Sequence, residues 1–408
     1  MKKIGKEPGL ADKLMTSNSS RRDFLKKAGA SFLAISFGGL LWRAVNQGVF
    51  STGKGPAYEL WSLDEASSLS EPMALVHAAT LASNPHNTQP WLFRVSETSI
   101  ELYADLTRTL GTMDPLLREM HMGLGCALEN LMQAATAKGY VPKLTYFPDP
   151  LDTGYIANVQ LNSSGKKTNS SLYQAISGRH THRGAYDTDR VVASETLQQM
   201  SMLGNDLPNV TLTWLTTNDE KSRAGELVIR ATEAIIADDE MSYDSNRWFR
   251  GNWDELQKNR DGLTLDAQAG PALVRAAGKM LPSVSHDSAN QFWLKSTRQT
   301  HVQTAAAYGL LTTADLHNPV DRVKAGRFWQ RLHLKGTAEG LALHPLNQPM
   351  EMRDRELQLG STNRPFGRQL TELTDTLDGE PVFLFRIGYP LTSVYPSPRR
   401  DLKDVIIK

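Results

Sequence analysis

The pattern of apolar and polar positions predicts alternating helices and strands along most of the chain. Apolar residues recur at helical spacing over 72–81 and again over 115–139, where Gly139 suits a left-handed helix end. Further helices are predicted over 172–177, 194–203, 219–236 and 319–340, and strands over 91–95, 100–103, 143–147, 155–161, 210–215 and 382–388. Such a mixture predicts an α+β fold. The stretch 238–260 is charged but carries two tryptophans, and we interpret it as a surface loop or lid.

A polar run over 163–171, with no apolar residue, is the best candidate for a link between two halves. The two long helices also match each other when one is shifted by 201 positions, a shift that lays Gly125 on Gly326. Coincidence is the alternative, because helices share such residues by chance. The two features together favour two fused halves, residues 63–162 and 172–400, packed as a pseudo-dimer within one chain.

The N-terminal residues 1–50 are predicted to be a signal or anchor followed by a spacer. The string SRRDFLK at 20–26 precedes a mostly apolar run at 28–42, which is typical of a twin-arginine export signal. That run is shorter than the roughly 20 residues that span a bilayer. The alternative is a chance arginine pair before an amphipathic helix. No clear cleavage site follows, so an uncleaved membrane anchor stays open. We expect export of the folded protein to the periplasm by the twin-arginine machinery.

Charge and cysteine content exclude several classes of function. With 45 basic and 44 acidic residues the formal net charge is +1, which gives no concentrated positive field for a nucleic acid. Cys126 is the only cysteine, so an intrachain disulfide and a multi-cysteine metal site are both impossible. We therefore expect no nucleic-acid partner and no metal.

The segment SNPHNTQPW over 83–91 lies between a predicted helix and a predicted strand. Its two prolines, among them Pro85, stiffen the turn, and Asn87 and Gln89 each offer a donor and an acceptor. A flavin has matching groups on its pyrimidine edge and ribityl chain. The alternative is a loop that ends the helix and whose side-chain amides only form hydrogen bonds with nearby backbone groups.

The segment RHTHR over 179–183 offers a phosphate site. Arg179 and Arg183, with the Thr181 hydroxyl between them, can converge on one phosphate when the chain is extended. A solvated basic turn is the alternative. A metal site at His180 and His182 is disfavoured, because no further ligand lies at suitable spacing.

These segments resemble the nitroreductase superfamily, which carries a PSxxNxQPW-like loop, an RxSxR phosphate grip and basic residues after a C-terminal strand. The resemblance extends from about Pro72 to Arg400 and implies an FMN cofactor. It implies further that three groups of residues bind FMN: Arg179, Thr181, Arg183, Arg399 and Arg400 at the phosphate; Pro85, His86, Asn87 and Gln89 at the ribityl chain or ring; and Pro345, Leu346 and Asn347, with a main-chain N–H, beside the isoalloxazine.

The layout looks most like the fused, Acg-like branch of the superfamily. The PSxxNxQPW-like loop occurs only in the first half and the phosphate grip only in the second. A pseudo-dimer would build one complete FMN site between its halves, and a monomer would suffice.

The predicted function is an FMN-dependent oxidoreductase that reduces nitroaromatic, quinone-like or similar small acceptors. The flavin does the chemistry, so no catalytic side chain is assigned. The alternative is an FMN-sequestering protein whose lid, around residues 247–250, covers the flavin. An uncovered ring would favour the enzyme, and a covered ring would favour storage. A flavin-free relic would need phosphate-grip arginines that point elsewhere.

Overall fold

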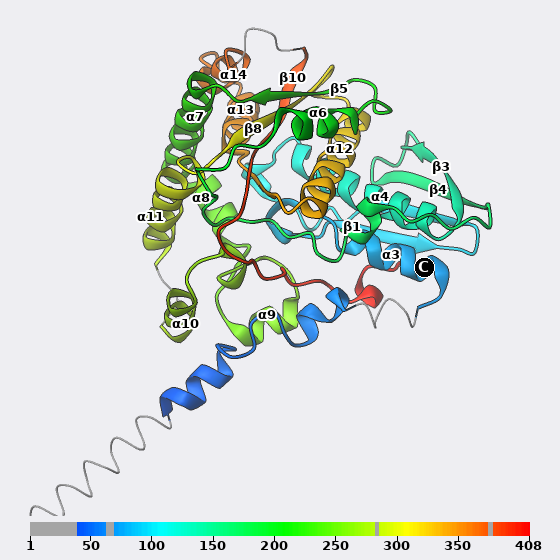
Figure 1. The fold of residues 1–408 in the computed structure, drawn as a ribbon, viewed down its shortest axis with the longest axis horizontal. Coiled ribbons are helices and arrows are strands. Elements are labelled where there is room, and N and C mark those ends of the chain that lie inside the picture. Colours follow the sequence, from blue (N-terminus) through cyan, green and yellow to red (C-terminus); the bar gives the residue numbers. More distant parts are fainter. Residues whose placement is uncertain (1–38, 63–68, 282–284, 374–377) are drawn as a thin grey trace, which may run out of the picture.

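The computed structural model describes residues 39–62, 69–281, 285–373 and 378–408 (Figure 1). The predicted twin-arginine motif at 20–26 lies outside these residues. The described chain contains two four-stranded sheets, a two-stranded sheet and the helices around them, as the α+β prediction requires.

The first sheet has the strand order β1-β2-β4-β3, and every neighbouring pair is antiparallel. Its strands are β1 (Trp91–Val95), β2 (Ser99–Ala104), β3 (Tyr140–Tyr146) and β4 (Tyr155–Ser163). Helix α4 (Arg118–Ala137) connects β2 to β3 and packs on the sheet, and α3 (Glu71–Thr80) packs against α4. The predicted helix at 72–81 and strand at 91–95 are thereby confirmed. Gly139 has a φ of 94°, so it ends α4 in the left-handed region, as predicted.

The second sheet repeats the topology of the first. Its order is β5-β8-β10-β9, again antiparallel throughout. Its strands are β5 (Val210–Leu215), β8 (Ala307–Thr313), β9 (Ala342–Pro345) and β10 (Glu380–Gly388), and α12 (Pro319–Ala338) connects β8 to β9. Each half thus runs strand, strand, long helix, strand, strand, with the same spatial order. The repetition is consistent with two fused halves.

The two long helices pack against each other between the two sheets (Figure 1). A Cβ added at Gly125 of α4 would lie 2.1 Å from the Val323 carbonyl oxygen, and one added at Gly326 of α12 would lie 2.0 Å from the Met122 carbonyl oxygen. The contact is reciprocal, and both glycines and both carbonyls are related by the 201-residue shift. Only glycine permits so close an approach of two helix backbones.

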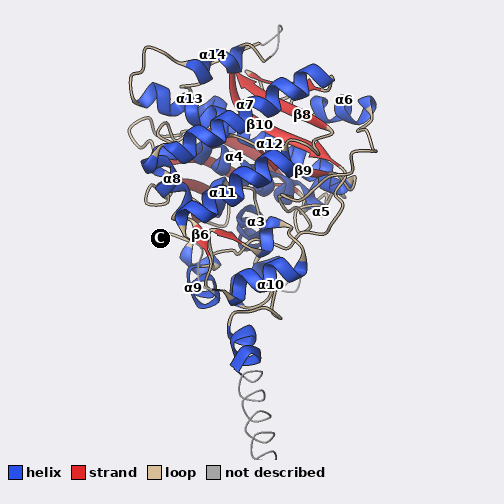
Figure 2. Cartoon of the chain, turned by 90° about the vertical axis from the view of Figure 1, so that its left-hand side faces the viewer, coloured by secondary structure: helices blue, strands red, loops and turns tan. Residues whose placement is uncertain are grey.

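Helices α7 (Asn218–Ala237), α13 (Gln348–Gln358) and α14 (Pro365–Thr371) pack on the second sheet, and α11 (His286–Ser296) packs on α7 (Figure 2). A capping box begins α7, in which the Thr217 hydroxyl accepts from the Glu220 N–H and the Glu220 carboxylate accepts from the Thr217 N–H. Two short helices, α5 (Ser171–Gln174) and α6 (Ser194–Met202), follow the predicted linker.

Residues 238–281 form an insertion between α7 and α11. It contains α8 (Asp239–Asn246), β6 (Phe249–Arg250), α9 (Trp253–Asn259), β7 (Leu263–Thr264) and α10 (Ala272–Met280). The stretch 238–260, interpreted as a surface loop or lid, is therefore not a plain loop, because it contains α8, β6 and α9. Trp248 holds part of this insertion against the body, because its ring is buried and its Nε1–H donates to the Thr109 carbonyl.

Both ends of the described chain are tied to the body. Residues 39–46 are helical, and the segment that follows them up to Ser62 buries Ala57, Tyr58 and Leu60. At the other end, residues 389–408 return from the second half to the first, where the Phe93 N–H donates to the Val405 carbonyl and the Ile407 N–H donates to the Phe93 carbonyl. No described helix has both the length and the apolar character that a membrane crossing requires.

Candidate functional site

The loop after α3 has a strained backbone. His86, Asn87 and Gln89 have φ values of 45°, 56° and 52°, in the left-handed region that disfavours residues with a Cβ. The Asn84 carboxamide oxygen accepts from the Gln89 N–H at 2.8 Å and holds the turn closed. Several such residues in one short loop cost free energy, and clustering of this kind is common at functional sites.

Two arginines distant in sequence converge on this loop. Arg179 donates to the Leu81 carbonyl at 3.0 Å, and Arg399 donates to the Ala82 carbonyl at 3.1 Å and to the Asn87 side-chain oxygen at 2.7 Å. Their exposed fractions are 3% and 2%. The Nε atom of each is buried without a hydrogen-bond partner in the described chain.

The charge on these arginines is not balanced by protein groups. No ion pair of the described residues includes Arg179, Arg183 or Arg399, whereas the buried Arg327 contacts the Glu129 carboxylate at 2.9 Å. Burial lowers the pKa of Arg179 and of Arg183 to about 10, and burial, then the charge of Arg179, lowers that of Arg399. A buried cation without a counter-charge is costly. The site therefore has the chemistry of an anion-binding site.

A narrow cleft brings these residues together. It is lined by Trp61, Ser83, Asn84, Asn87, Arg179, His180, Thr181, Arg183, Leu263, Ser397 and Arg399. The predicted Asn87, Arg179, Thr181, Arg183 and Arg399 all lie in this set. The free space inside it is only about 20 Å³, far below the roughly 300–1,000 Å³ of ligand sites, so the cleft is nearly closed in this structure.

Trp61 and His180 form one wall of the cleft, and neither was predicted as a site residue. The Trp61 ring lies 4.7 Å from the Arg399 guanidinium and 4.6 Å from the His180 ring, and its Nε1–H donates to the Ser397 carbonyl at 2.8 Å. Burial, then the charges of Arg179 and Arg399, lowers the pKa of His180 to about 3, so its imidazole is neutral. The mostly apolar cluster AYELW at 57–61, just before the first predicted helix, was the available signal for Trp61.

The insertion forms the cover of the cleft. Gly262 and Asn87 are joined by two hydrogen bonds, from the Gly262 N–H to the Asn87 carbonyl and from the Asn87 side-chain amide to the Gly262 carbonyl. Leu263 then lines the cleft directly. The predicted cover at 247–250 is thus displaced along the chain, since Trp248 packs toward Thr109 instead.

Four of the predicted residues border the strained loop without lining the cleft. Pro85 packs close to Gly123, and His86 bonds to Ser245 at 3.2 Å; burial, then the charge of Arg183, lowers the pKa of His86 to about 4. Gln89 donates to the Arg260 carbonyl and accepts from the Arg400 N–H. The Arg400 guanidinium contacts the carbonyls of Gln89 and Asp404 and the Asp105 carboxylate, so it does not join the other arginines.

The structure does not bring the Pro345–Asn347 segment to the cleft. Pro345 ends strand β9, where it pairs with Phe385, so the predicted loop is partly a strand. Leu346 is fully buried, and its N–H donates to the Leu384 carbonyl. Asn347 accepts from the Leu384 N–H. The Leu346 N–H is thus used within the sheet and is not available to a flavin ring.

The two histidines of the RHTHR segment point to different partners. His182 bonds to the Thr392 carbonyl at 2.7 Å, while His180 faces Trp61. Among the described residues no group of three or more His, Cys, Asp or Glu could hold a metal ion.

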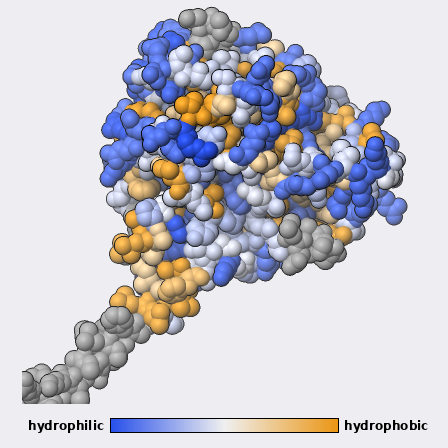
Figure 3. Space-filling view, viewed as in Figure 1, coloured by the Kyte–Doolittle hydropathy of each residue, from blue (hydrophilic) through white to orange (hydrophobic). Residues whose placement is uncertain are grey.

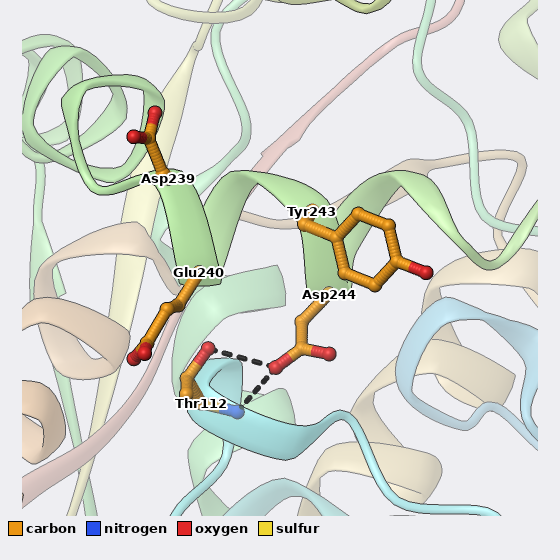
Figure 4. Close-up of a pocket in the computed structure, with 5 residues that line it drawn as sticks. All are labelled: Thr112, Asp239, Glu240, Tyr243 and Asp244. Carbon is orange, nitrogen blue, oxygen red and sulfur yellow. Dashed lines mark hydrogen bonds between the residues drawn. The ribbon is translucent and has the colours of Figure 1, made fainter.

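A second hollow, of about 390 Å³, lies at the start of α8 (Figure 4). Two of its three acidic residues already have partners, because Asp244 accepts from the Thr112 N–H and hydroxyl, and Glu240 contacts Arg355 at 2.7 Å. Of these two hollows in the described part of the chain, the arginine cleft is the one that combines unbalanced positive charge with unpartnered donors.

Curated relatives extend over most of the chain. A Mycobacterium tuberculosis protein provisionally named an NAD(P)H nitroreductase is 26% identical over 363 residues, which cover 87% of this chain and 95% of the relative. An uncharacterized protein of the same organism is 24% identical and covers 80% of this chain and 90% of its own length. These relatives support a place in the nitroreductase superfamily.

No family model matches the chain. Among solved structures, the FMN- and NADPH-dependent nitroreductase NfnB from a Sphingopyxis species is 19% identical and has a TM-score of 0.37, over 59% of this chain and 99% of that chain.

Proposed function

We propose that the arginine cleft binds the phosphate of FMN through Arg179, Arg183 and Arg399, with the Thr181 hydroxyl as a further donor. One observation carries the proposal: among the described residues the buried Arg179 and Arg399 and the half-buried Arg183 have no carboxylate partner, and the first two retain an unpartnered Nε–H. A phosphate ester carries nearly two negative charges and three acceptor oxygens. It would therefore supply both the missing charge and the missing acceptors.

On this basis the protein is an FMN-dependent oxidoreductase of the nitroreductase type. Bound FMN supplies the exchange of an electron pair between a donor and an acceptor. The chain's own residues bind the cofactor and shield it from water. Arg399 holds Asn87 in the cleft, and Trp61 and Leu263 line the cleft and exclude water from it. The name of the longest-matching relatives points to NAD(P)H as the donor, with nitroaromatic, quinone-like or similar small molecules as acceptors.

FMN sequestration is the second candidate function, and the cover favours it. The reciprocal hydrogen bonds between Gly262 and Asn87 close the insertion over the loop, and Leu263 and Trp61 both line the cleft. A flavin enclosed in this way would exchange electrons slowly with soluble partners.

The remaining proposals concern location and assembly. The twin-arginine motif at 20–26 supports export of the folded protein to the periplasm, with or without an uncleaved anchor. The repeated topology and the reciprocal Gly125–Gly326 contact support an intramolecular pseudo-dimer that needs no second chain.

Anaerobic reduction distinguishes the two functions. The full-length protein, loaded with FMN, is mixed with NADPH and NADH under anaerobic conditions while the flavin absorption is recorded. Bleaching within seconds supports the oxidoreductase, and adding a quinone or nitroaromatic then restores the bands. Bands that persist with both nucleotides but bleach with dithionite support sequestration. Failure to load FMN would overturn both candidates.

A further inference from the structure

The lower end of the molecule exposes a concentration of large apolar side chains (Figure 3). Of the eighteen large apolar residues that are exposed in the described chain, eight lie in the two short segments 40–50 and 273–281. These are Leu40, Leu41, Trp42, Val45, Phe50, Leu273, Val274 and Leu281. Their exposed fractions run from 55% to 82%. A gathering of this kind is uncommon on a soluble monomer and marks an interaction site.

The two segments form one surface, here called the apolar tip. Arg43 donates to the Met280 carbonyl at 2.7 Å, and the Lys279 ammonium donates to the Gly48 carbonyl at 3.0 Å. Figure 1 shows the N-terminal helix beside α10, at the end of the molecule where the described chain begins. Contacts between residues more than 200 positions apart therefore hold the tip together.

Helix α10 presents its apolar side outward because its charged side is tied to the body. The buried Asp266 carboxylate contacts Lys279 at 2.6 Å and Arg275 at 3.5 Å. Leu273 is left 82% exposed, and no residue of α10 is buried. An amphipathic helix normally packs its apolar side on the protein, so this helix has an orientation suited to another apolar phase.

The tip itself carries basic residues and no acidic ones. Residues 39–56 and 269–281 contain Arg43, Lys54, Arg275 and Lys279 and no Asp or Glu. Because Arg275 and Lys279 pair with the buried Asp266, the net positive charge of the tip comes from Arg43 and Lys54. Apolar side chains flanked by basic ones are the composition of surfaces that lie in the headgroup region of anionic membranes.

The position of the tip in the chain indicates what it contacts. The described chain begins at residue 39, within the tip, and the sequence that leads into it is the apolar run 28–42. We propose that the apolar tip rests on the surface of an anionic lipid bilayer, with Leu273 and Val274 of α10 inserted beside the N-terminal segment. This contact is separate from flavin binding.

A local environment probe tests the proposal. Leu273→Cys is labelled with the fluorophore NBD in the full-length protein, where the native Cys126 is only 1% exposed, and vesicles of equimolar phosphatidylethanolamine and phosphatidylglycerol are added. The matched control is Leu151→Cys, 95% exposed in the β3–β4 turn. We expect a blue shift and quenching by lipid-borne quenchers at position 273, and neither change at position 151.

A second measurement needs no label. Hydrogen exchange of residues 272–280 should slow by about tenfold or more when vesicles are added, because insertion of apolar side chains holds the helix in place. The double substitution Leu273→Glu with Val274→Glu should abolish that protection, while FMN content reports that the body remains folded. Equal aqueous signals at positions 273 and 151 would overturn the proposal. Protection that appears without lipid and accompanies a doubled mass would overturn it in favour of a second copy.

Discussion

Replacing Arg179 by methionine should separate FMN affinity from stability. The substitution keeps an unbranched side chain but removes a buried cation that has an unpartnered Nε–H. Two charge-assisted hydrogen bonds to phosphate contribute about 1.5–3 kcal/mol each. We therefore expect a loss of about 3–6 kcal/mol in FMN binding, or roughly a 10²- to 10⁴-fold rise in Kd.

The stability of the FMN-free protein should respond in the opposite sense. Burial lowers the pKa of Arg179 from its ordinary value of 12.5 to about 10, which corresponds to about 3 kcal/mol of unfavourable free energy in the charged form. Methionine removes this cost but also removes the bonds to the Leu81 carbonyl and to His333. The free energy of unfolding without FMN should therefore stay within about 1 kcal/mol of the wild-type value, or rise.

Arg327→Met is the matched control, because that buried arginine has a carboxylate partner. Removing it leaves the fully buried Glu129 with Arg331, at 2.8 Å, as its remaining cation. We expect a loss of about 2–4 kcal/mol in unfolding free energy with unchanged FMN affinity. Urea denaturation and FMN titration by fluorescence give both quantities. If Arg179→Met binds FMN as tightly as wild type, or is destabilised as much as Arg327→Met, then Arg179 is not an unbalanced cation that waits for a phosphate.

Gly326, His344 and Arg400 each lie in surroundings that make the effect of a substitution predictable. Gly326→Ala should lower the free energy of unfolding by at least about 1–3 kcal/mol in urea denaturation, because its Cβ would clash with a carbonyl oxygen of α4, whereas Gly270→Ala, with open space around it, should change little. Burial, then nearby cationic groups, holds the pKa of His344 well below 6.5; the unfolded chain therefore binds the extra proton, and stability should fall below pH 6.5 by about 1.4 kcal/mol per pH unit from this residue. Thermal denaturation between pH 5 and pH 7 should show a smaller slope for His344→Gln, and an unchanged slope would contradict the assignment. Arg400→Ala should weaken FMN binding far less than Arg399→Ala, since only Arg399 lines the cleft; equal losses in FMN titrations would count against the site.

Local sequence patterns correctly predicted the helices and strands whose buried positions repeat at regular spacing along the chain. The apolar runs at 91–95, 210–215 and 382–388 are strands, and the long periodic helices are α4 and α12. Helix α13 was not predicted because its sequence, QPMEMRDRELQ, is highly charged although most of it is buried. Its charges are satisfied by distant groups, for example Asp354 by Arg118 at 2.7 Å. A pairing across 236 positions leaves no local trace in one sequence.

In the candidate site, too, local motifs could be recognised in the sequence, whereas contacts between distant residues could not. The structure brings Asn87 of one motif-bearing segment to Arg179 and Arg399, which come from segments distant in sequence. That these residues bind FMN stays a prediction. Trp61 was missed because its role depends on contacts with Arg399 and Ser397, more than 330 positions away. The segment 345–347 was predicted to offer a main-chain donor to the flavin ring, and within it the Leu346 N–H pairs with the Leu384 carbonyl of β10 instead. The role of the segment as a whole stays a prediction.

A comparison of FMN with riboflavin isolates the contribution of the phosphate group to binding. The two ligands share the isoalloxazine ring and ribityl chain and differ in the phosphate alone. Titration of the full-length, flavin-free protein should give FMN a Kd lower than that of riboflavin by about 10³-fold or more, because the phosphate engages at least two unpaired buried arginines. Equal affinities, or no binding of FMN, would contradict the assignment of the arginine cleft as a phosphate site.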